Sequence, residues 1–241
     1  MAEWKARRFW KSAGVRQVAD GWEVTLDDRP LRTPGKLALV LPTERLAKAV
    51  ADEWDAQADM IDPNTMPLTR AANSAVEKVA PQFDAVADML AEYGGTDLLC
   101  YRTDAPAALA ERQETEWQPL LDWAADRYGA RLAVTQGLMP VAQDSAALSR
   151  LRAALAGLDT FGLTALHDLV ALPGSLVLGL AVIEGRLDAD AAFALSRLDE
   201  DHQAEQWGRD DEAEAAASAK AGAMQVAERV WLLSRPHSFV S

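Results

Sequence analysis

The 241-residue sequence contains a single cysteine, Cys100. One thiol cannot form a disulfide within the chain, so we expect the protein to fold in a reducing compartment. The histidines His167, His202 and His237 are far apart, and Cys100 has no neighbouring ligand. Because zinc and related metals need clustered His, Cys or carboxylate ligands, the sequence predicts no metal site and no cofactor.

Basic residues are also scarce, with 24 Lys and Arg against 37 Asp and Glu and a formal net charge of −13. Nucleic acids are bound through cationic contacts to phosphates, so this balance argues against nucleic-acid binding and favours a basic protein as partner. Residues 1–41 hold eight basic and five acidic side chains, a net of +3, which leaves −16 for the remainder. The acidic character therefore belongs to the part that we expect to be helical.

Long apolar runs are missing as well. The longest, Ser175–Ile183, is far shorter than the ~20 residues of a membrane-spanning helix, so we expect a soluble protein without membrane insertion. The first residues, MAEWKARRFWKSAGVRQ, have the basic character of a mitochondrial presequence, but they run directly into strand-like sequence. We expect a bacterial cytoplasmic protein, with the mitochondrial matrix as the location if the basic N-terminus is a targeting segment.

Signatures of catalysis are absent too. Neither GxGxxG nor GxxxxGK[ST] occurs, so nothing supports nucleotide binding. Cys100 lies between apolar neighbours in DLLCYR, where a thiol usually packs as a small hydrophobic side chain. We therefore expect a protein that is not an enzyme. The competing enzymatic hypothesis uses Cys100, or the carboxylates Glu53 and Asp199, in a cleft between domains.

What the sequence does contain is a β-like segment followed by a long helical one. Residues 9–41 have short runs rich in Val, Trp, Thr and Leu, separated by the hairpin-type pairs Asp20-Gly21 and Asp27-Asp28. A small meander of this kind is not stable alone and must pack on helices. We predict an α+β fold, with a small N-terminal antiparallel β-rich domain over residues 1–75 and a larger all-helical domain over residues 76–241.

The first predicted helix begins after Thr43, whose side chain can cap it. Its packing stripe is formed by Leu46, Val50, Trp54 and Ala58. Glu53 and Gln57 project beside this stripe. Polar groups there need hydrogen-bond partners, so these two residues are either structural pins or contacts for a partner.

Proline and glycine positions delimit the later helices. They are predicted from near Pro81 to Gly94, from Pro106 to Gly129, and over 145–156, 160–172, 175–184, 188–207 and 210–234. Pro119 either kinks its helix or begins a new one, and residues 132–141 have the pattern of a strand. The acidic run from Asp210 to Glu214 is typical of a helix start, where carboxylates meet the positive end of the helix dipole.

The predicted helix over residues 188–207 carries an acid on its packing side. At about 100° per residue, Asp199 and Gln206 share a side with Leu195, Leu198 and His202, whereas Arg197, Glu200 and Asp201 point away. A carboxylate in that position should be paired. It either belongs to an internal hydrogen-bond network or receives a cation from a partner, and the residues alone leave both interpretations open.

Several segments, in order along the whole chain, resemble the assembly chaperone family for the alpha subunit of F1-ATPase, in its mitochondrial and bacterial forms. They are RFWK, DDRPLRTP, PTERLAKAVADEWDAQ, MPLTRAANSAVE, DLLCYR, RQETEWQPLLDWAADRYG and LSRLDEDHQAEQWG. The resemblance implies a β-rich domain followed by a helical one. It also implies a protein without catalysis that holds the free alpha subunit until it joins the beta subunit in the hexamer, and we expect a bacterial member that is a monomer.

The resemblance also suggests which residues matter. Trp54, in the family's EWD motif, is expected to pack in the core between domains, and Asp199 occupies the position of the family's functionally important acid, where Glu is usual. The expected structural positions are Glu53, Trp54, Arg70 and Asn73. The expected partner contacts are Asp199, Glu200, Gln203 and Trp207. A scaffold for a different basic partner protein is the competing hypothesis for a binding function.

Overall fold

The computed structural model describes residues 7–137 and 139–236. Lys5, His237 and the start of the candidate targeting segment therefore lie outside the described residues. The chain divides into two compact units. The first unit consists of the residues up to Gln82, residues Thr160–Thr164 and the residues from Arg229 onward, and the second of Phe83–Asp159 and Ala165–Glu228.

A small antiparallel sheet opens the first unit and confirms the predicted β-rich N-terminus. Its strands are β1 (Ala13–Val18), β2 (Gly21–Leu26), β3 (Arg29–Pro30) and β4 (Val40–Leu41). β2 pairs with each of the other three. Asp27 and Asp28 have φ of 46° and 68°, the left-handed conformation that a two-residue hairpin turn requires. Gly21 is needed because a Cβ there would lie 2.4 Å from the Leu41 carbonyl oxygen.

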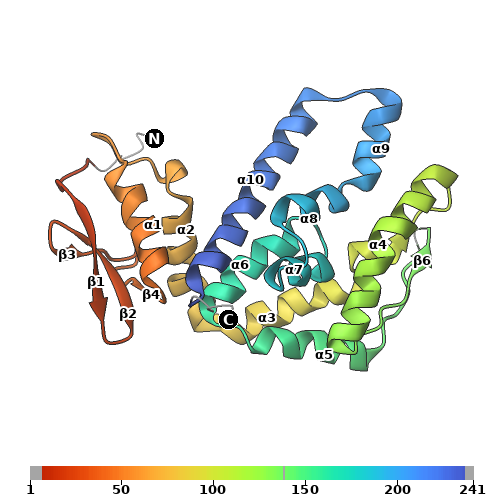
Figure 1. Cartoon of the computed structure of the whole chain (residues 1–241), viewed down its shortest axis with the longest axis horizontal. Coiled ribbons are helices and arrows are strands. Elements are labelled where there is room, and N and C mark those ends of the chain that lie inside the picture. The colour runs from red at the N-terminus through yellow and green to blue at the C-terminus, as the bar shows by residue number, and fades with distance from the viewer. Residues whose placement is uncertain (1–6, 138, 237–241) are drawn as a thin grey trace, which may run out of the picture. The chain divides into compact units, whose positions relative to one another are not determined.

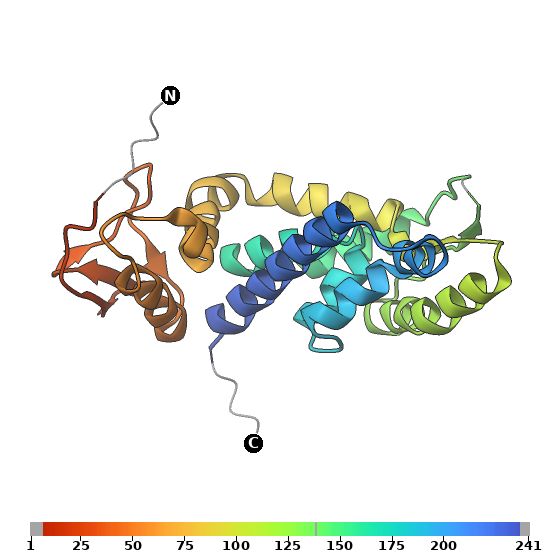
Figure 2. The ribbon, with the colours of Figure 1, turned by 90° about the horizontal axis from the view of Figure 1, so that it is seen from above.

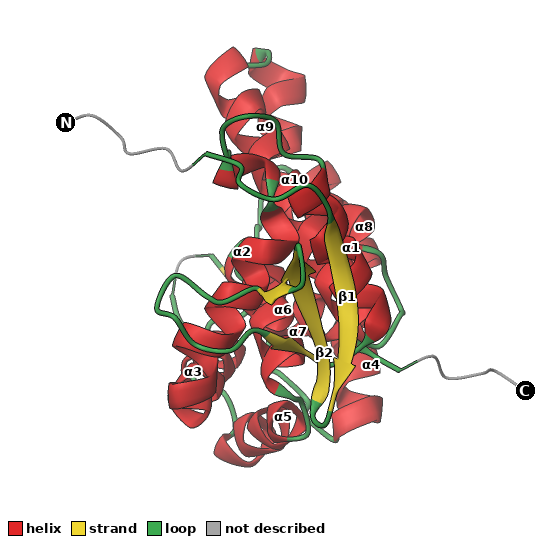
Figure 3. Ribbon diagram, turned by 90° about the vertical axis from the view of Figure 1, so that its left-hand side faces the viewer, coloured by secondary structure: helices red, strands yellow, loops and turns green. Residues whose placement is uncertain are grey.

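The helix α1 (Glu44–Asp55) packs on β1 and β2 (Figure 3). Thr43 caps it as predicted, accepting a hydrogen bond from the Leu46 N–H. Leu46 and Val50 are buried, but α1 ends at Asp55, so the prediction that Ala58 continues the stripe is wrong. After a short 3-10 turn at Pro63–Thr65, α2 (Pro67–Ser74) follows and leads into a π-helical turn at Ala75–Val79.

The second unit is helical, and most of the predicted helix boundaries are confirmed. Its helices are α3 (Phe83–Glu92), α4 (Ala107–Tyr128), α5 (Ser145–Ala156), α7 (Leu176–Ile183), α8 (Ala189–Ser196) and α9 (Leu198–Trp207), while α6 (Thr160–Ala171) and α10 (Asp211–Ser234) have residues in both units. All side chains from Leu176 to Val182 are buried, so α7 forms the centre of the core (Figure 1). No described helix combines the length and apolarity needed to cross a bilayer.

Two predictions for the middle of the chain need correction. Pro119 lies inside a continuous α4, so no new helix begins there. The predicted strand over residues 132–141 is reduced to β6 (Thr135–Gln136), which pairs in parallel with β5 (Tyr101–Arg102). In the part of the chain that the structure describes, the strand beside this segment is β5, which is two residues long. The pairing therefore extends over two residues only.

The single helix predicted over residues 188–207 is in fact two helices, α8 and α9. They are separated at Arg197, whose φ of −107° and ψ of 13° leave the helical range. The Leu195 carbonyl, freed from the helical ladder, accepts a hydrogen bond from the Trp117 indole N–H at 2.8 Å. A side chain from α4 thus satisfies the end of α8, which the apolar spacing along the helix did not reveal. α9 lies between α4 and the first half of α10 (Figures 1 and 2).

Candidate functional site

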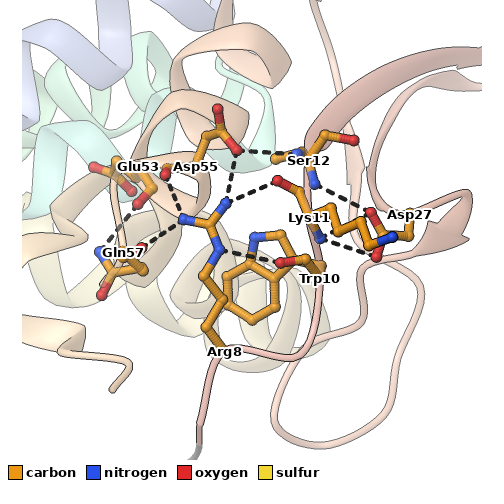
Figure 4. Close-up of polar contacts among 9 residues, drawn as sticks. Arg8, Trp10, Lys11, Ser12, Asp27, Glu53, Asp55 and Gln57 are labelled. Carbon is orange, nitrogen blue, oxygen red and sulfur yellow. Dashed lines mark hydrogen bonds and ion pairs between the residues drawn. The ribbon is translucent and has the colours of Figure 1, made fainter. Parts of the chain in front are cut away.

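The family position Glu53 lies in a polar network at the end of α1 (Figure 4). The Glu53 carboxylate accepts hydrogen bonds from the N–H groups of Leu68 and Thr69 at 2.7 and 2.8 Å, and from the Thr69 hydroxyl at 2.7 Å. The residue before α2, Met66, offers no side-chain cap of its own. Glu53 therefore caps α2 from a neighbouring helix, which makes it a structural pin.

Gln57 is the second pin in this network. Its side-chain N–H groups donate to the Glu53 carbonyl and to the Thr65 hydroxyl oxygen, each at 3.0 Å, and its side-chain oxygen accepts from the Asp62 N–H at 2.8 Å. The side chain is buried. The sequence left two roles open for Glu53 and Gln57, structural pin or partner contact. Their hydrogen bonds support the structural role for both residues.

Arg8 ties the N-terminal segment to the end of α1, a role that the sequence did not reveal. Its guanidinium donates to the carbonyl oxygens of Trp10, Lys11, Asp55 and Gln57 and to the Asp55 carboxylate (Figure 4). Next to it, the backbone N–H groups of Ser12 and Lys11 donate to Asp27 and hold the pKa of that carboxyl below its usual value. Arg8 is thus engaged within the first unit.

The remaining family positions of the first unit differ in their surroundings. Trp54 is half-buried and meets Trp10 edge to face, with ring centroids 5.1 Å apart. This contact packs two tryptophans of the first unit on each other, and the packing of Trp54 between domains stays a prediction. Arg70 is exposed, whereas Asn73 is half-buried and its side-chain oxygen meets no donor among the described residues.

We predict that Glu53→Ala lowers the free energy of unfolding by about 2 kcal/mol, because two helix N–H groups and a hydroxyl lose their acceptor. Chemical denaturation measures this loss. Asp52→Ala on the exposed side of α1 is the matched control and should change stability by less than about 0.5 kcal/mol. Equal losses in the two variants would contradict the capping role.

The expected partner acid, Asp199, lies in the first turn of α9 and is held by α4. Its carboxylate accepts a hydrogen bond from the Gln113 side-chain N–H at 2.6 Å. Gln113 is fully buried, and its side-chain oxygen accepts from the Thr103 N–H at 2.8 Å, which fixes the orientation of the amide. Asp199 therefore takes part in an internal network, although its side chain is not fully covered.

Arg102 belongs to the same network through the backbone carbonyl of Gln113. Its guanidinium is almost fully buried, donates to the carbonyl oxygens of Leu99 and Gln113, and lies over the Trp117 ring at 5.2 Å. Burial lowers its pKa. Since Trp117 also anchors the end of α8, the face of α4 that carries Gln113 and Trp117 holds both sides of the break between α8 and α9.

The other expected contacts on α9 point outward. Glu200 and Gln203 are exposed, and Trp207 is 82% exposed. The packing predicted for this segment is confirmed for Leu198, which is buried, but not for Gln206, which is exposed. At the next helix, the Asp210 carboxylate accepts from the Ala213 N–H at 2.8 Å, so the acidic run does begin a helix as predicted.

Cys100 has no features of a nucleophile. Its side chain is fully buried, and burial together with the charge of Asp97 raises the pKa of the thiol to about 12. A thiol that stays protonated is a poor nucleophile. Among residues 7–137 and 139–236, no three His, Cys, Asp or Glu side chains form a group that could hold a metal ion.

Comparison with known proteins agrees with the resemblance seen in the sequence. The family model of the ATP12 chaperone protein matches residues 7–125. The mitochondrial protein atp12 of Schizosaccharomyces pombe is 26% identical over 216 residues, which cover 84% of this chain and 74% of that protein.

Two crystal structures have the same fold. Atp12 from Paracoccus denitrificans is 64% identical and superposes with a TM-score of 0.94, covering 97% of this chain and 100% of the other. A protein from Agrobacterium tumefaciens is 39% identical with a TM-score of 0.91, covering 96% of this chain and 87% of the other. On this identity and coverage, the chain belongs to the ATP12 chaperone family.

Proposed function

We propose that this protein is an assembly chaperone of ATP synthase that binds the free alpha subunit of F1, keeps it from aggregating and releases it into the alpha/beta hexamer. The observation that carries the proposal is α9, an acidic helix held in place by α4 that leaves Glu200, Gln203 and Trp207 exposed. Exposed aromatic side chains are enriched at protein interfaces. The expected location is the bacterial cytoplasm, or the mitochondrial matrix if the N-terminus is a targeting segment.

The proposed mechanism needs no catalysis. A subunit that is outside its ring exposes large interfaces, and such surfaces aggregate. A protein that binds the folded monomer over one of these surfaces stabilises it by mass action, without hydrolysing ATP. Release follows when the beta subunit competes for the same surface with a larger interface.

The partner contacts in this proposal are Glu200, Gln203 and Trp207, all exposed on α9, and Asp199 supports them by holding the start of α9 on α4. Acidic side chains on a helix favour a basic partner surface and speed its encounter. The same acidity favours the second candidate, a scaffold for a different basic protein. Competition between the alpha subunit and other basic proteins separates the two candidates.

The enzymatic hypothesis has little physical support. Cys100 is a buried, protonated thiol, Glu53 caps α2, and Asp199 is hydrogen-bonded to Gln113. Each of these groups has a structural role that explains its position. None is free to activate a nucleophile in the way that covalent or general-base catalysis requires.

Light scattering of refolding F1 alpha subunit tests the proposal. Denatured alpha subunit diluted into buffer should aggregate, and an equimolar amount of this protein should suppress the scattering without ATP. Because the protein acts by binding, suppression should scale with stoichiometry and reach its limit near one chaperone per subunit. Bovine serum albumin at the same concentration is the control, and equal suppression by albumin would contradict the proposal.

A further inference from the structure

A groove of about 330 Å³ opens in the second unit, between α8 and α9 on one side and the first half of α10 on the other. Half of its ten lining residues are charged. The lining side chains without charge are Phe193, Ala194, Ala217, Ser218 and Ala221. On α10, Glu214, Ala217, Ser218 and Ala221 have the spacing of a single helix face, so this face looks into the groove.

Small side chains on α10 keep the groove open. Residues 211–220 of α10 are exposed or half-buried, whereas the later residues Met224, Ala227 and Val230 of the same helix are buried. Because alanine has a high helix propensity that does not depend on packing, residues 211–220 can be helical although they are largely exposed. The first half of α10 therefore forms a wall, while the second half belongs to the core.

The cations in the groove are already neutralised. Arg197 pairs with Asp201 at 3.5 Å, and Arg209 pairs with Glu214 at 3.1 Å. A third acid, Asp190, accepts a hydrogen bond from the Gln225 side chain at 2.7 Å. Residues 197–214 contain eight acidic residues and two basic residues, a net of −6, and Asp201 and Glu214 of this segment line the groove. The charge of this segment therefore complements a basic partner.

Asp199 faces away from this groove. It is bound by Gln113 of α4, and Asp201, which lines the groove, lies about 200° further around the helix. Asp199 and Gln113 thus set the position of α9, whose other face forms a groove wall. On this geometry Asp199 is a positioning residue, and the groove adds Asp201 and Glu214 to the acidic contacts that α9 offers a partner.

We propose that this groove binds a basic amphipathic helix of the client, the protein that the chaperone holds. The apolar face of such a helix would cover Phe193 and the alanines, and its Lys or Arg side chains would compete with Arg197 and Arg209 for Asp201 and Glu214. Burial of an apolar helix face in a groove is a recurrent mode of peptide recognition. The inference rests on the proposed function only in taking the client to be the F1 alpha subunit.

A synthetic probe tests the groove without that assumption. The probe is a fluorescent peptide of about 18 leucine and lysine residues, patterned as a basic amphipathic helix of about five turns. Anisotropy measures its affinity for the full chain. Ala217→Trp fills the groove and should weaken binding at least about tenfold, whereas Ala219→Trp, exposed on α10 outside the groove, should change it less than about twofold.

A charge pair provides a second, independent comparison. Glu214→Lys and Glu212→Lys each reverse one acid in the first turn of α10, but only Glu214 lines the groove. Both variants lose the same favourable charge at the helix start, and Glu214→Lys also loses an exposed ion pair with Arg209, so it should be only slightly the less stable of the two. We expect Glu214→Lys to weaken peptide binding about fivefold more than Glu212→Lys does.

The same variants with isolated F1 alpha subunit separate the two proposals. Loss of peptide and alpha-subunit binding in Ala217→Trp supports both. Peptide binding that depends on Ala217, with no binding of alpha subunit by the wild type, supports the groove and overturns the proposed client. No peptide binding by the wild type, or equal effects of Ala217→Trp and Ala219→Trp, overturns the groove.

Discussion

Asp97→Ala is expected to lower the free energy of unfolding by about 3 to 5 kcal/mol, a large part of the stability of a typical domain. Asp97 is fully buried and accepts hydrogen bonds from the Leu99 N–H at 3.1 Å, the Ser175 hydroxyl at 2.7 Å and the Val177 N–H at 3.0 Å. Without the carboxylate these donors stay buried and unpaired, and α7 loses its tie to the segment before β5.

Chemical denaturation followed by circular dichroism measures the loss. Asp104→Ala is the matched control, because Asp104 is an exposed acid in the same stretch, and its stability should stay within about 0.5 kcal/mol of wild type. A loss below about 1 kcal/mol for Asp97→Ala would contradict the role of this carboxylate as the acceptor that holds the start of α7.

Asp97 also gives the stability a specific pH dependence. Burial outweighs the donated hydrogen bonds and raises the pKa of Asp97 to about 6. A raised pKa in the folded state adds stability that is full below the unfolded value near 3.8 and is lost as the pH rises through about 6. Asp97→Asn lacks this contribution, so its destabilisation relative to wild type should be about 1 kcal/mol larger at about pH 5 than at about pH 7.5. A pH-independent difference would exclude the raised pKa.

Asp199→Lys is expected to reduce the affinity for the client at least about tenfold while leaving a folded protein. The new ammonium group would face the Gln113 side-chain N–H, donor against donor, in a network that already contains the buried Arg102 guanidinium. The start of α9 would separate from α4, and the groove wall would move with it. Since Leu198 still anchors α9, the stability loss should stay near 2 kcal/mol, about the value of one charged hydrogen bond.

Glu212→Lys is the matched control for this substitution. It makes the same charge change at an exposed acid in the first turn of α10 that does not line the groove. Binding to the alpha subunit, measured by surface plasmon resonance, should fall several-fold less than for Asp199→Lys. Hydrogen exchange should increase in α9 for Asp199→Lys alone. Equal binding losses with unchanged exchange would mean that Asp199 acts through its charge and not through its hydrogen bond to Gln113.

The sequence was sufficient to predict the order of the secondary structure. Apolar periodicity together with Thr43, Pro106 and Gly129 delimits helices that the structure contains, because caps and breakers act locally. The break at Arg197 could not be predicted, since it depends on the Trp117 indole reaching the Leu195 carbonyl across 78 positions in sequence. The extent of β6 likewise depends on its partner strand and not on its own residues.

The candidate site was predictable only in part. The spacing on the helix placed Asp199 on a packing side, and the structure supplies its partner there. Gln113 was missed, although it lies four residues before Trp117 and thus on the same buried stripe of α4. Asp97 was missed because a buried carboxylate is recognised by the donors around it, and these come from Leu99 and from the distant Ser175 and Val177.

Size-exclusion chromatography with light scattering, using both proteins from the same organism, tests whether this protein binds free F1 alpha subunit and releases it on assembly. We predict a 1:1 complex that disappears when beta subunit is added, with the alpha subunit moving into an alpha/beta assembly. If no complex forms, or if this protein binds assembled F1 as well as it binds the free alpha subunit, the proposed function is wrong.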